Sequence, residues 1–249
     1  MDSEQFIYGR NTILEHLEHK PEYISKIYIR QHLKGKIIHD IEREASSCRI
    51  PVLRVPGKKL SLLVGPVNDQ GVVASVSETG YLELEDWLAD IDTADNPVIL
   101  ALDEIEDPHN LGAIIRTALA SGIDAIMVAK HRQASLSAGV MKASAGTVLR
   151  MPVIRVVNMN QSLTRLKDSG FWVCGTDMKG AVDYRKQNYL MPLVVVIGSE
   201  ENGIRKKTSE HCDMLVKIPM ANNVESLNAS VSAALVCYEI LRQRQAKPV

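Results

Sequence analysis

Six short apolar runs alternate with five segments of helical periodicity in the second half of the chain, and this alternation constrains the fold most. Such alternation produces a mostly parallel sheet with helices on both faces. Ligands of these sheets bind where the strands end, so chemistry is expected in the loops that follow them. The predicted strands span residues 98–102, 125–128, 153–157, 172–176, 193–197 and 215–218, and the predicted helices 110–121, 135–145, 159–168, 204–211 and 228–242.

The last predicted helix carries apolar residues at helical spacing, and we expect this stripe to face the core. Its members are Val231, Leu235, Tyr238 and Leu241.

The composition agrees with a buried parallel sheet and excludes several other classes of protein. Hydrophobic residues make up 45% of the 249 residues and aromatic residues only 4%, so small aliphatic side chains form most of the core. This composition argues against disorder and fibrous folds. The longest apolar runs, such as 193–197, are too short to cross a bilayer, and the N-terminus lacks the features of a signal peptide. We therefore expect a cytoplasmic protein that does not enter membranes.

The four cysteines are Cys48, Cys174, Cys212 and Cys237, and none belongs to a CxxC pair. Spacing of this kind favours reduced thiols over a disulfide framework, and it predicts no metal site.

Charge divides the chain into three segments. Residues 1–77 have a net charge of +2, residues 78–96 have −7 with no base, and residues 97–249 have +4. The acidic segment predicts a linker with a helical turn near 84–88, which ends at Asn96 and Pro97 where a strand begins. The sequence therefore predicts two domains, 1–77 and 97–249, joined by this linker.

The first domain is predicted to be a small α/β unit with basic side chains. Helices are expected at 10–17 and 35–45 and strands at 24–29, 51–55 and 71–76. The basic side chains could form an ordinary solvated face, or they could contact the phosphates of an RNA without reading its bases. These residues are Arg30, Lys34, Lys36, Arg54, Lys58 and Lys59.

The first polar loop, residues 103–112, follows the first strand of the second domain. Asn110 could simply cap the next helix, and Arg116 could be a surface residue. Gly112, however, would expose backbone amides in the first turn. Six residues correspond to about 240° of net rotation, so Asn110 and Arg116 meet at one site only if Asn110 projects from the loop before the helix.

The second loop, residues 196–203, follows the most apolar strand. Gly198 and Gly203 bracket a tight turn that lets a ligand approach the backbone. The loop lacks the GxGxxG dinucleotide fingerprint, and it is no P-loop because Ile204 follows Gly203. Glu200 and Glu201 suit a cation better than a phosphate, and a turn without a function is the alternative.

The third loop, residues 218–230, precedes the final helix. Ser226 or Asn228 could cap that helix, and capping alone would explain either residue. The three loops in this order are a stronger indication of a site than any one of them.

Together, DPHNLGAIIRTA, IGSEENG and IPM…ESLNASVSAAL resemble the three ordered motifs of the SpoU (TrmH-like) branch of the SPOUT RNA methyltransferases. The resemblance covers residues 98–244. The first domain resembles the L30e-like RNA-binding extension of the bacterial 23S rRNA (guanosine-2'-O-)-methyltransferases. The overall length of the chain and the sequence of residues 200–244 resemble those of the members of this group that act on guanosine 2251. The resemblance implies a C-terminal trefoil knot in the catalytic domain and a homodimer formed through that domain.

The implied reaction transfers a methyl group from S-adenosylmethionine to a ribose 2'-hydroxyl of 23S rRNA, without a metal. The family's polar active-site positions fall on Asn110, Arg116, Glu200 and Asn228. The cofactor-binding positions fall on Thr176, Gly198, Ile218, Ser226 and Leu227.

The family's favoured proton acceptor falls on Arg116, but a guanidinium is fully protonated below a pKa of about 12. We therefore expect Arg116 to hold the target phosphate and stabilise a developing oxyanion. Asn110 and Asn228 would orient the ribose, and Glu200 would pair with Arg116.

Two other functions are compatible with parts of the sequence. One is a catalytically silent RNA-binding or ribosome-assembly factor on the same fold, which would not bind S-adenosylmethionine. The other is a Rossmann-like nucleotide enzyme, against which the missing GxGxxG argues.

Overall fold

The computed structural model describes residues 5–76, 81–178, 182–222 and 224–245. The chain divides into two compact units: unit 1 comprises Met1–Gly80 and Ser135–Arg150, and unit 2 comprises Tyr81–Ala134 and Met151–Val249. The predicted catalytic domain of 97–249 includes the stretch that groups with unit 1, and the boundaries at residues 77 and 97 stay predictions.

Unit 1 is built on a four-stranded sheet in the order β1-β4-β2-β3. Strand β4 is antiparallel to β1 and β2, and β3 is parallel to β2, so β1, β2 and β3 run in one direction. Helices α1, α2 and α3 each follow one of these strands and therefore begin at the same edge of the sheet. The elements are β1 (Gln5–Tyr8), α1 (Arg10–His19), η1 (Pro21–Tyr23), β2 (Ile24–Arg30), α2 (Lys36–Ser47), β3 (Val52–Val55), α3 (Gly57–Val64) and β4 (Val72–Val76).

The core of unit 1 is aliphatic and lies between the sheet and helices α1 and α2. Ile13 and Ile41 from the helices are fully buried against Ile27 and Ile29 of β2. The sequence prediction missed β1 and α3. The stretch Ser135–Arg150 contains α6 (Ala138–Ala143) and η3 (Thr147–Leu149).

Unit 2 contains a seven-stranded, fully parallel sheet in the order β7-β6-β5-β10-β8-β11-β9. Its strands are β5 (Val98–Asp103), β6 (Ala125–Ala129), β7 (Val153–Val156), β8 (Trp172–Thr176), β9 (Val182–Asp183), β10 (Leu193–Gly198) and β11 (Met214–Lys217). Its helices are α4 (Leu84–Asp90), η2 (Thr93–Asp95), α5 (Pro108–Ala120), α7 (Met159–Asp168), η4 (Tyr184–Lys186), α8 (Lys206–Ser209) and α9 (Ala229–Gln245).

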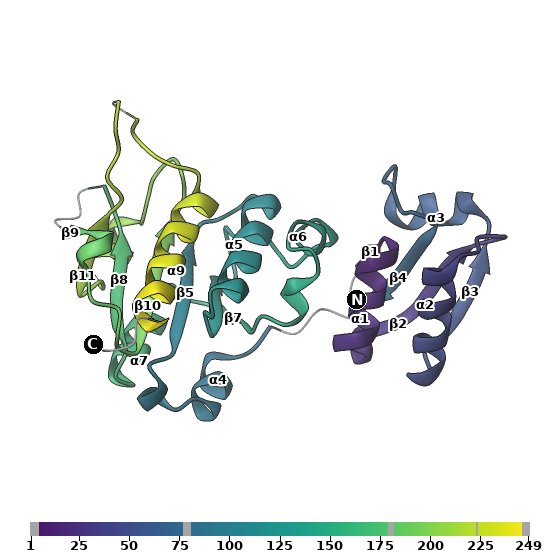
Figure 1. The fold of residues 1–249 in the computed structure, drawn as a ribbon, viewed down its shortest axis with the longest axis horizontal. Helices are drawn as coiled ribbons and strands as arrows, with labels where there is room; N and C mark the ends of the chain where they lie inside the picture. The colour runs from purple at the N-terminus through teal and green to yellow at the C-terminus, as the bar shows by residue number, and fades with distance from the viewer. Residues whose placement is uncertain (1–4, 77–80, 179–181, 223, 246–249) are drawn as a thin grey trace. The chain divides into compact units, whose positions relative to one another are not determined.

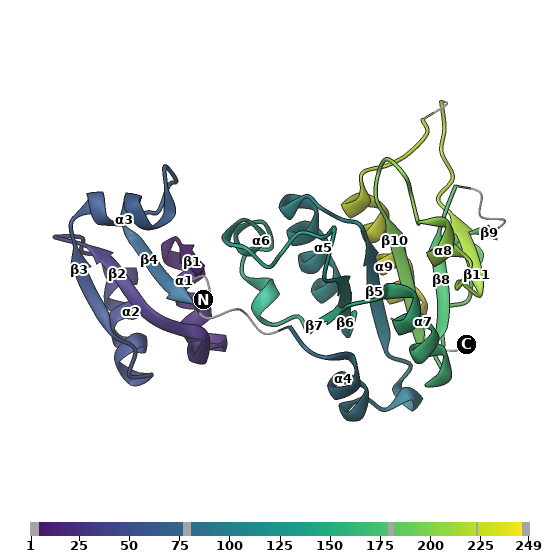
Figure 2. The ribbon, with the colours of Figure 1, turned by 180° about the vertical axis from the view of Figure 1, so that it is seen from behind.

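Helices cover both faces of this sheet. Helices α5 and α9 pack together and lie over β5 and β10 on one face (Figure 1). Helices α4 and α7 lie on the other face, which is seen from behind in Figure 2, where Trp87, Leu163 and Leu166 join the core against the strands. The predicted α/β class, with a mostly parallel sheet and a smaller N-terminal α/β domain, is confirmed. The trefoil knot stays a prediction.

Part of the acidic segment that was predicted as a linker belongs to the core of unit 2. The predicted helical turn at 84–88 corresponds to α4, and its Leu84 and Trp87 are buried in the core of unit 2. Glu85, Asp86 and Asp90 of the acidic segment lie on this helix, whose buried residues pack in the core.

The predicted core stripe of the last helix is wrong. Val231 and Tyr238 are 46% and 51% exposed, and Leu235 and Leu241 are only partly buried. The buried face of α9 is formed instead by Ala229, Ala233, Val236, Cys237 and Ile240. These residues recur at the same helical spacing, so the period was right and the choice of face was not.

No helix among the described residues combines the length and apolarity that crossing a membrane requires.

Candidate functional site

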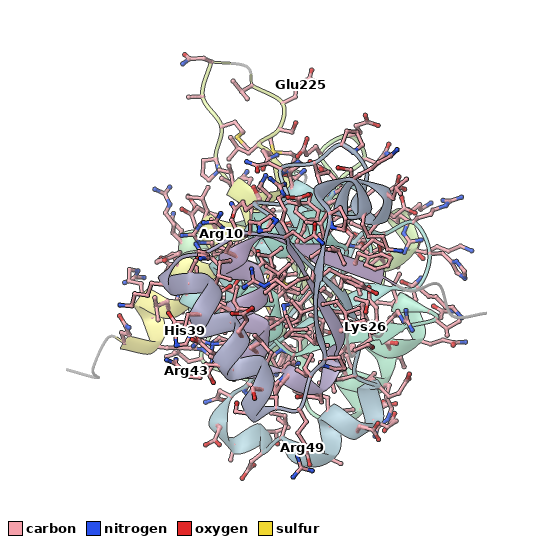
Figure 3. The ribbon with its side chains drawn as sticks, turned by 90° about the vertical axis from the view of Figure 1, so that its right-hand side faces the viewer. Arg10, Lys26, His39, Arg43, Arg49 and Glu225 are labelled. Carbon is pink, nitrogen blue, oxygen red and sulfur yellow. The ribbon has the colours of Figure 1, made fainter. Side chains whose placement is uncertain are left out.

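The three polar loops predicted from the sequence lie at the carboxyl edge of the unit 2 sheet. Strands β5 and β10 are neighbours, and their last residues, Asp103 and Gly198, are paired in register. The loop after β5 leads into α5, and the loop after β10 contains Glu200. The loop between β11 and α9 leaves the body of the unit, and Figure 3 shows Glu225 on it. Parallel strands thus bring distant segments to one edge.

Asn110, Glu200 and Asn228 contact one another at this edge. Asn110 Nδ2 donates to Glu200 Oε1 at 2.9 Å, and Asn228 Nδ2 donates to the same oxygen at 2.5 Å and to Asn110 Oδ1 at 2.9 Å. The backbone N–H of Ala229 also donates to Glu200 Oε1, at 3.2 Å. Each of the three polar loops therefore contributes one side chain to a single hydrogen-bonded cluster.

The N-terminus of α9 holds Asn228, one member of this cluster, in place. Asn228 Oδ1 accepts hydrogen bonds from the backbone N–H groups of Ser230 and Val231, at 3.0 and 3.4 Å, which is the geometry of an N-cap. The same side chain therefore caps the helix through its oxygen and holds Asn110 and Glu200 through its nitrogen.

A tight turn positions Glu200. The backbone N–H of Gly203 donates to the carbonyl of Ser199 at 2.9 Å, so Glu200 lies in a closed turn directly after β10. A Cβ added at Gly198 would overlap with backbone atoms of Gly203 and Ile204. Only glycine fits at this strand end, because the returning backbone occupies the space of a side chain.

A cavity of about 720 Å³ opens beside this turn. All five residues predicted to bind the cofactor line it, namely Thr176, Gly198, Ile218, Ser226 and Leu227. Glu200 also lines it, which connects the cavity with the hydrogen-bonded cluster.

The described lining of this cavity is acidic. It includes five carboxylates and one base, Lys206, and therefore favours a ligand that carries positive charge. The carboxylates are Asp177, Glu200, Glu201, Glu210 and Glu225.

Arg116 does not join the cluster in the way the sequence predicted. Helix α5 begins at Pro108 with Asp107 as its cap, so Asn110 lies in the first helical turn and does not project from a preceding loop. Arg116 is therefore on a different side of α5, roughly 9 Å further along its axis. The predicted pair of Glu200 with Arg116 is absent from the described residues, because Glu200 Oε1 accepts from the two asparagines and Ala229 instead. Arg116 is exposed.

The buried Asp103 and the exposed Arg205 form an ion pair that the sequence analysis did not identify. The Asp103 carboxylate is fully buried and accepts from the Arg205 guanidinium, with Nη2 to Oδ1 at 2.6 Å, and from the Arg205 backbone N–H at 3.0 Å. Hydrogen bonding to Asp103 raises the pKa of the Arg205 guanidinium. A charged residue at the end of a fully apolar strand was the signal that could have found this pair.

The thiols near the cavity do not offer a nucleophile at neutral pH. Burial raises the pKa of Cys174 and of Cys212 to about 12, so both remain protonated. The described part of the chain also contains no group of three or more histidine, cysteine or acidic side chains placed to hold a metal.

Two family models match the chain. The SpoU rRNA methylase family matches residues 97–238, and a model for the substrate-binding part of RNA 2'-O ribose methyltransferases matches residues 6–82. A protein of Staphylococcus epidermidis, assigned to the TrmH family of tRNA/rRNA methyltransferases, is 42% identical over 239 residues, covering 96% of this chain and 95% of that protein.

Solved structures agree with this match. The SpoU methyltransferase AviRb of Streptomyces viridochromogenes, in complex with S-adenosylmethionine, superposes with a TM-score of 0.85 at 25% identity, covering 98% of this chain and 92% of that one. An rRNA methyltransferase of Sinorhizobium meliloti with bound S-adenosylmethionine gives a TM-score of 0.82 at 25% identity, covering 98% and 88%.

Proposed function

The chain belongs to the SpoU rRNA methylase family and is an RNA methyltransferase that uses S-adenosylmethionine, and from this premise we propose that it methylates the ribose 2'-hydroxyl of a guanosine in 23S rRNA. The observation that carries the proposal is the cluster of Asn110, Glu200 and Asn228 at the rim of an acidic cavity. The position corresponding to guanosine 2251 is the specific target that we propose.

The cavity beside Gly198 suits the cofactor in its position at the strand end and in its charge. When bound, S-adenosylmethionine supplies an electrophilic methyl group on a positively charged sulfur. The close turn after Gly198 allows a ligand to reach the backbone, and five carboxylates against one lysine attract a cation. We assign cofactor binding to the predicted residues Thr176, Gly198, Ile218, Ser226 and Leu227.

Glu200 is the residue that we propose accepts the proton of the 2'-hydroxyl. Its Oε1 is occupied by three hydrogen bonds, and its Oε2 makes none with the described residues while the side chain lines the cavity. As the oxygen of the ribose bonds to the methyl carbon and the carbon–sulfur bond breaks, the hydroxyl proton would move to Oε2. Asn110 and Asn228 hold the carboxylate in place and orient the ribose.

The variant Glu200→Gln tests this role sharply. Glutamine keeps an oxygen that can accept from the asparagines, but it cannot take up the proton. We expect kcat to fall by at least about 100-fold, while the affinity for S-adenosylmethionine measured by calorimetry changes little. A fall of less than tenfold would mean that Glu200 only orients its neighbours.

The basic edge of unit 1 is proposed to hold the RNA. Helices α1, α2 and α3 begin at one edge of the sheet, where the exposed side chains of Lys34, Lys36, Lys58 and Lys59 lie near the helix starts. Helix N-termini and lysines both favour phosphate. Arg30 and Arg54 already pair with Asp69 and Glu42. Arg116 is proposed to hold a phosphate near the target ribose.

The RNA target can be identified from the modification that disappears in cells without this protein. A 2'-O-methyl group blocks alkaline cleavage of the neighbouring phosphodiester, because the attacking hydroxyl is gone. We expect one protected guanosine to be lost from 23S rRNA, and to be restored by the wild-type gene but not by a Glu200→Gln gene. Loss of a protected position in tRNA would contradict the proposed target.

We further propose that the protein is a homodimer formed through the catalytic unit, in the cytoplasm. The support is the exposed apolar stripe of α9, which includes Val231 and Tyr238. An apolar groove of about 360 Å³ also includes Leu235 of this helix and Val224 and Leu227 of the preceding loop. Covering this face would remove apolar surface from water.

A further inference from the structure

A second hollow lies at the carboxyl edge of the unit 2 sheet. It has a volume of about 310 Å³ and lies where β6 and β7 end. His131 and Arg132 come from the loop after β6, Asn158 and Asn160 from the start of α7, and Arg205 from the turn before α8. The remaining lining residues include Val157, whose side chain is 81% exposed.

The lining of this hollow is basic and that of the cofactor cavity is acidic, while the carboxylates of Asp103 and Glu104 lie behind the hollow and pair with both of its arginines. Its lining contains two guanidinium groups and a histidine and no carboxylate, whereas the described lining of the cofactor cavity contains five carboxylates and one lysine. Two recesses at one edge of the same sheet therefore prefer ligands of opposite charge.

Three consecutive residues connect the two recesses. Ile204 and Lys206 line the cofactor cavity, and Arg205 between them lines the hollow. Arg205 is held in place because its guanidinium and its backbone N–H both donate to the buried Asp103. Nη1 of Arg205 also lies 3.4 Å from Glu104 Oε1, and because the guanidinium has five N–H groups, these pairings still leave donors for a ligand.

Arg132 is free to change partners. Its side chain is 73% exposed, and its ion pair with Glu104 has a long Nη1–Oε1 distance of 3.3 Å. The Glu104 side chain is only 19% exposed, but its Oε1 also lies 3.4 Å from Arg205 Nη1, so an anion in the hollow could recruit the Arg132 guanidinium without leaving Glu104 unpaired. Asn160 also lines the hollow, and its Oδ1 is buried from solvent without a hydrogen-bond partner among the described residues.

We propose that this hollow binds a backbone phosphate of the substrate RNA, next to the nucleotide whose ribose enters the cofactor site. Arg132 and Arg205 hold the phosphate oxygens. The proposal rests on the proposed function. It adds a contact in the catalytic unit that positions the strand without reading its bases.

The variant Arg132→Gln tests the phosphate contact, and Arg165→Gln is its matched control. Arg165 is also an exposed arginine of unit 2 in an ion pair, with Glu85, but it does not line the hollow. Binding is measured by fluorescence anisotropy at several salt concentrations, with a 23S rRNA fragment and with bulk tRNA, using whichever RNA the wild-type enzyme methylates. We expect Arg132→Gln to weaken RNA binding about three- to tenfold and to reduce the salt slope by about one.

Two further variants separate charge from folding. Arg132→Lys keeps a positive charge and should bind RNA within about twofold of the wild type. Val157→Glu adds a carboxylate to the hollow at an exposed position and should weaken binding. The control Leu190→Glu adds one before β10, at the opposite edge of the sheet, and should not weaken binding. S-adenosylmethionine affinity should be unchanged in all of them.

Equal RNA affinities and salt slopes for Arg132→Gln and Arg165→Gln would overturn the inference and leave the proposed function intact. Methylation of tRNA and not of 23S rRNA would instead overturn the proposed target, while the comparison of the variants would still be read on tRNA. If the wild type methylated neither RNA, both proposals would fail.

Discussion

At the scale of single residues, the site depends on a few positions that only one type of residue can occupy. Gly198 is one of these, because the backbone of Gly203 and Ile204 fills the space of its missing side chain. The close turn fixes Glu200 at the rim of the cavity and leaves the strand end open to a ligand. A substitution there acts on the turn and on the cavity at once.

The variant Gly198→Ala should weaken S-adenosylmethionine binding by at least about tenfold, because the turn has to move away from the new methyl group. Isothermal titration calorimetry gives the affinity directly. Gly57→Ala is the control, since its negative φ and the flexible Arg30 side chain beside it accommodate a Cβ. Unchanged cofactor affinity in Gly198→Ala would show that the turn adapts easily.

His16 predicts a pH dependence for unit 1. The imidazole is fully buried in α1 with Nε2 unpaired among the described residues, and burial lowers its pKa from 6.5 to about 4. The unfolded chain therefore binds a proton first as the pH falls. The contribution of the neutral His16 side chain to the free energy of unfolding is therefore complete above about pH 6.5. It decreases by about 3 kcal/mol in total as the pH falls from 6.5 to 4.

Hydrogen exchange of α1 peptides between pH 7.5 and 4.5, corrected for the intrinsic exchange rate, measures this loss. His16→Leu should abolish most of it. His39→Leu removes an exposed imidazole that projects from α2 (Figure 3) and should behave as the wild type does. The explanation would fail if all three proteins lost protection in parallel.

At the scale of elements, α9 has two apolar sides, and only one of them is covered. Its buried side packs on α5 and β10, while Val231 and Tyr238 remain exposed. An exposed apolar stripe on a helix is typical of a surface that a partner covers.

Tyr238→Glu should therefore raise the dissociation constant of the proposed homodimer by at least tenfold. The charge would be buried in an apolar interface, but it costs the single subunit little because the side chain is exposed there. Size-exclusion chromatography with light scattering over a range of concentrations measures the change. Trp172→Glu alters a similarly exposed aromatic residue outside α9 and serves as the control. A wild type that stays monomeric at high concentration would contradict the prediction.

The elements also show which parts of the fold a single sequence can predict. Strand β8 and helix α7 agree with the predicted bounds, because helical periodicity marks α7 and a turn separates it from the short apolar run of β8. Strand β1 and helix α3 were missed, because four and eight residues carry little periodic signal. The face of α9 was assigned wrongly, since both of its sides are apolar and only the packing decides between them.

The site was predicted in part for the same reasons. The order of the loops and the resemblance of their motifs pointed to Asn110, Glu200 and Asn228, which do lie in contact. The pairing of Glu200 with Arg116 was not met, because Pro108 starts α5 early and turns the two side chains of that helix apart. Asp103 and Arg205 were missed because their pairing over 102 residues depends on the sheet.

At the scale of the whole molecule, the two units have separate cores. Unit 1 has its own cluster of buried aliphatic residues, and the cluster on one face of the unit 2 sheet includes Trp87. Both tryptophans of the chain, Trp87 and Trp172, belong to unit 2. Tryptophan fluorescence therefore reports the unfolding of unit 2 alone.

S-adenosylmethionine should stabilise one unit and not the other. At 100 times its dissociation constant, the cofactor should raise the free energy of unfolding followed by tryptophan fluorescence by about 2.7 kcal/mol. Hydrogen exchange in α1 and α2 of unit 1 should be unaffected. Equal protection of both units would mean that they unfold as one.

The alternation of Ile204, Arg205 and Lys206 between two recesses of opposite charge restricts how this stretch can evolve. An insertion or deletion of one codon between Gly198 and Arg205 would shift the register and exchange the residues that face the two recesses. Point substitutions can accumulate there, whereas changes of length cannot. Homologous genes should accordingly align across these eight positions without a gap.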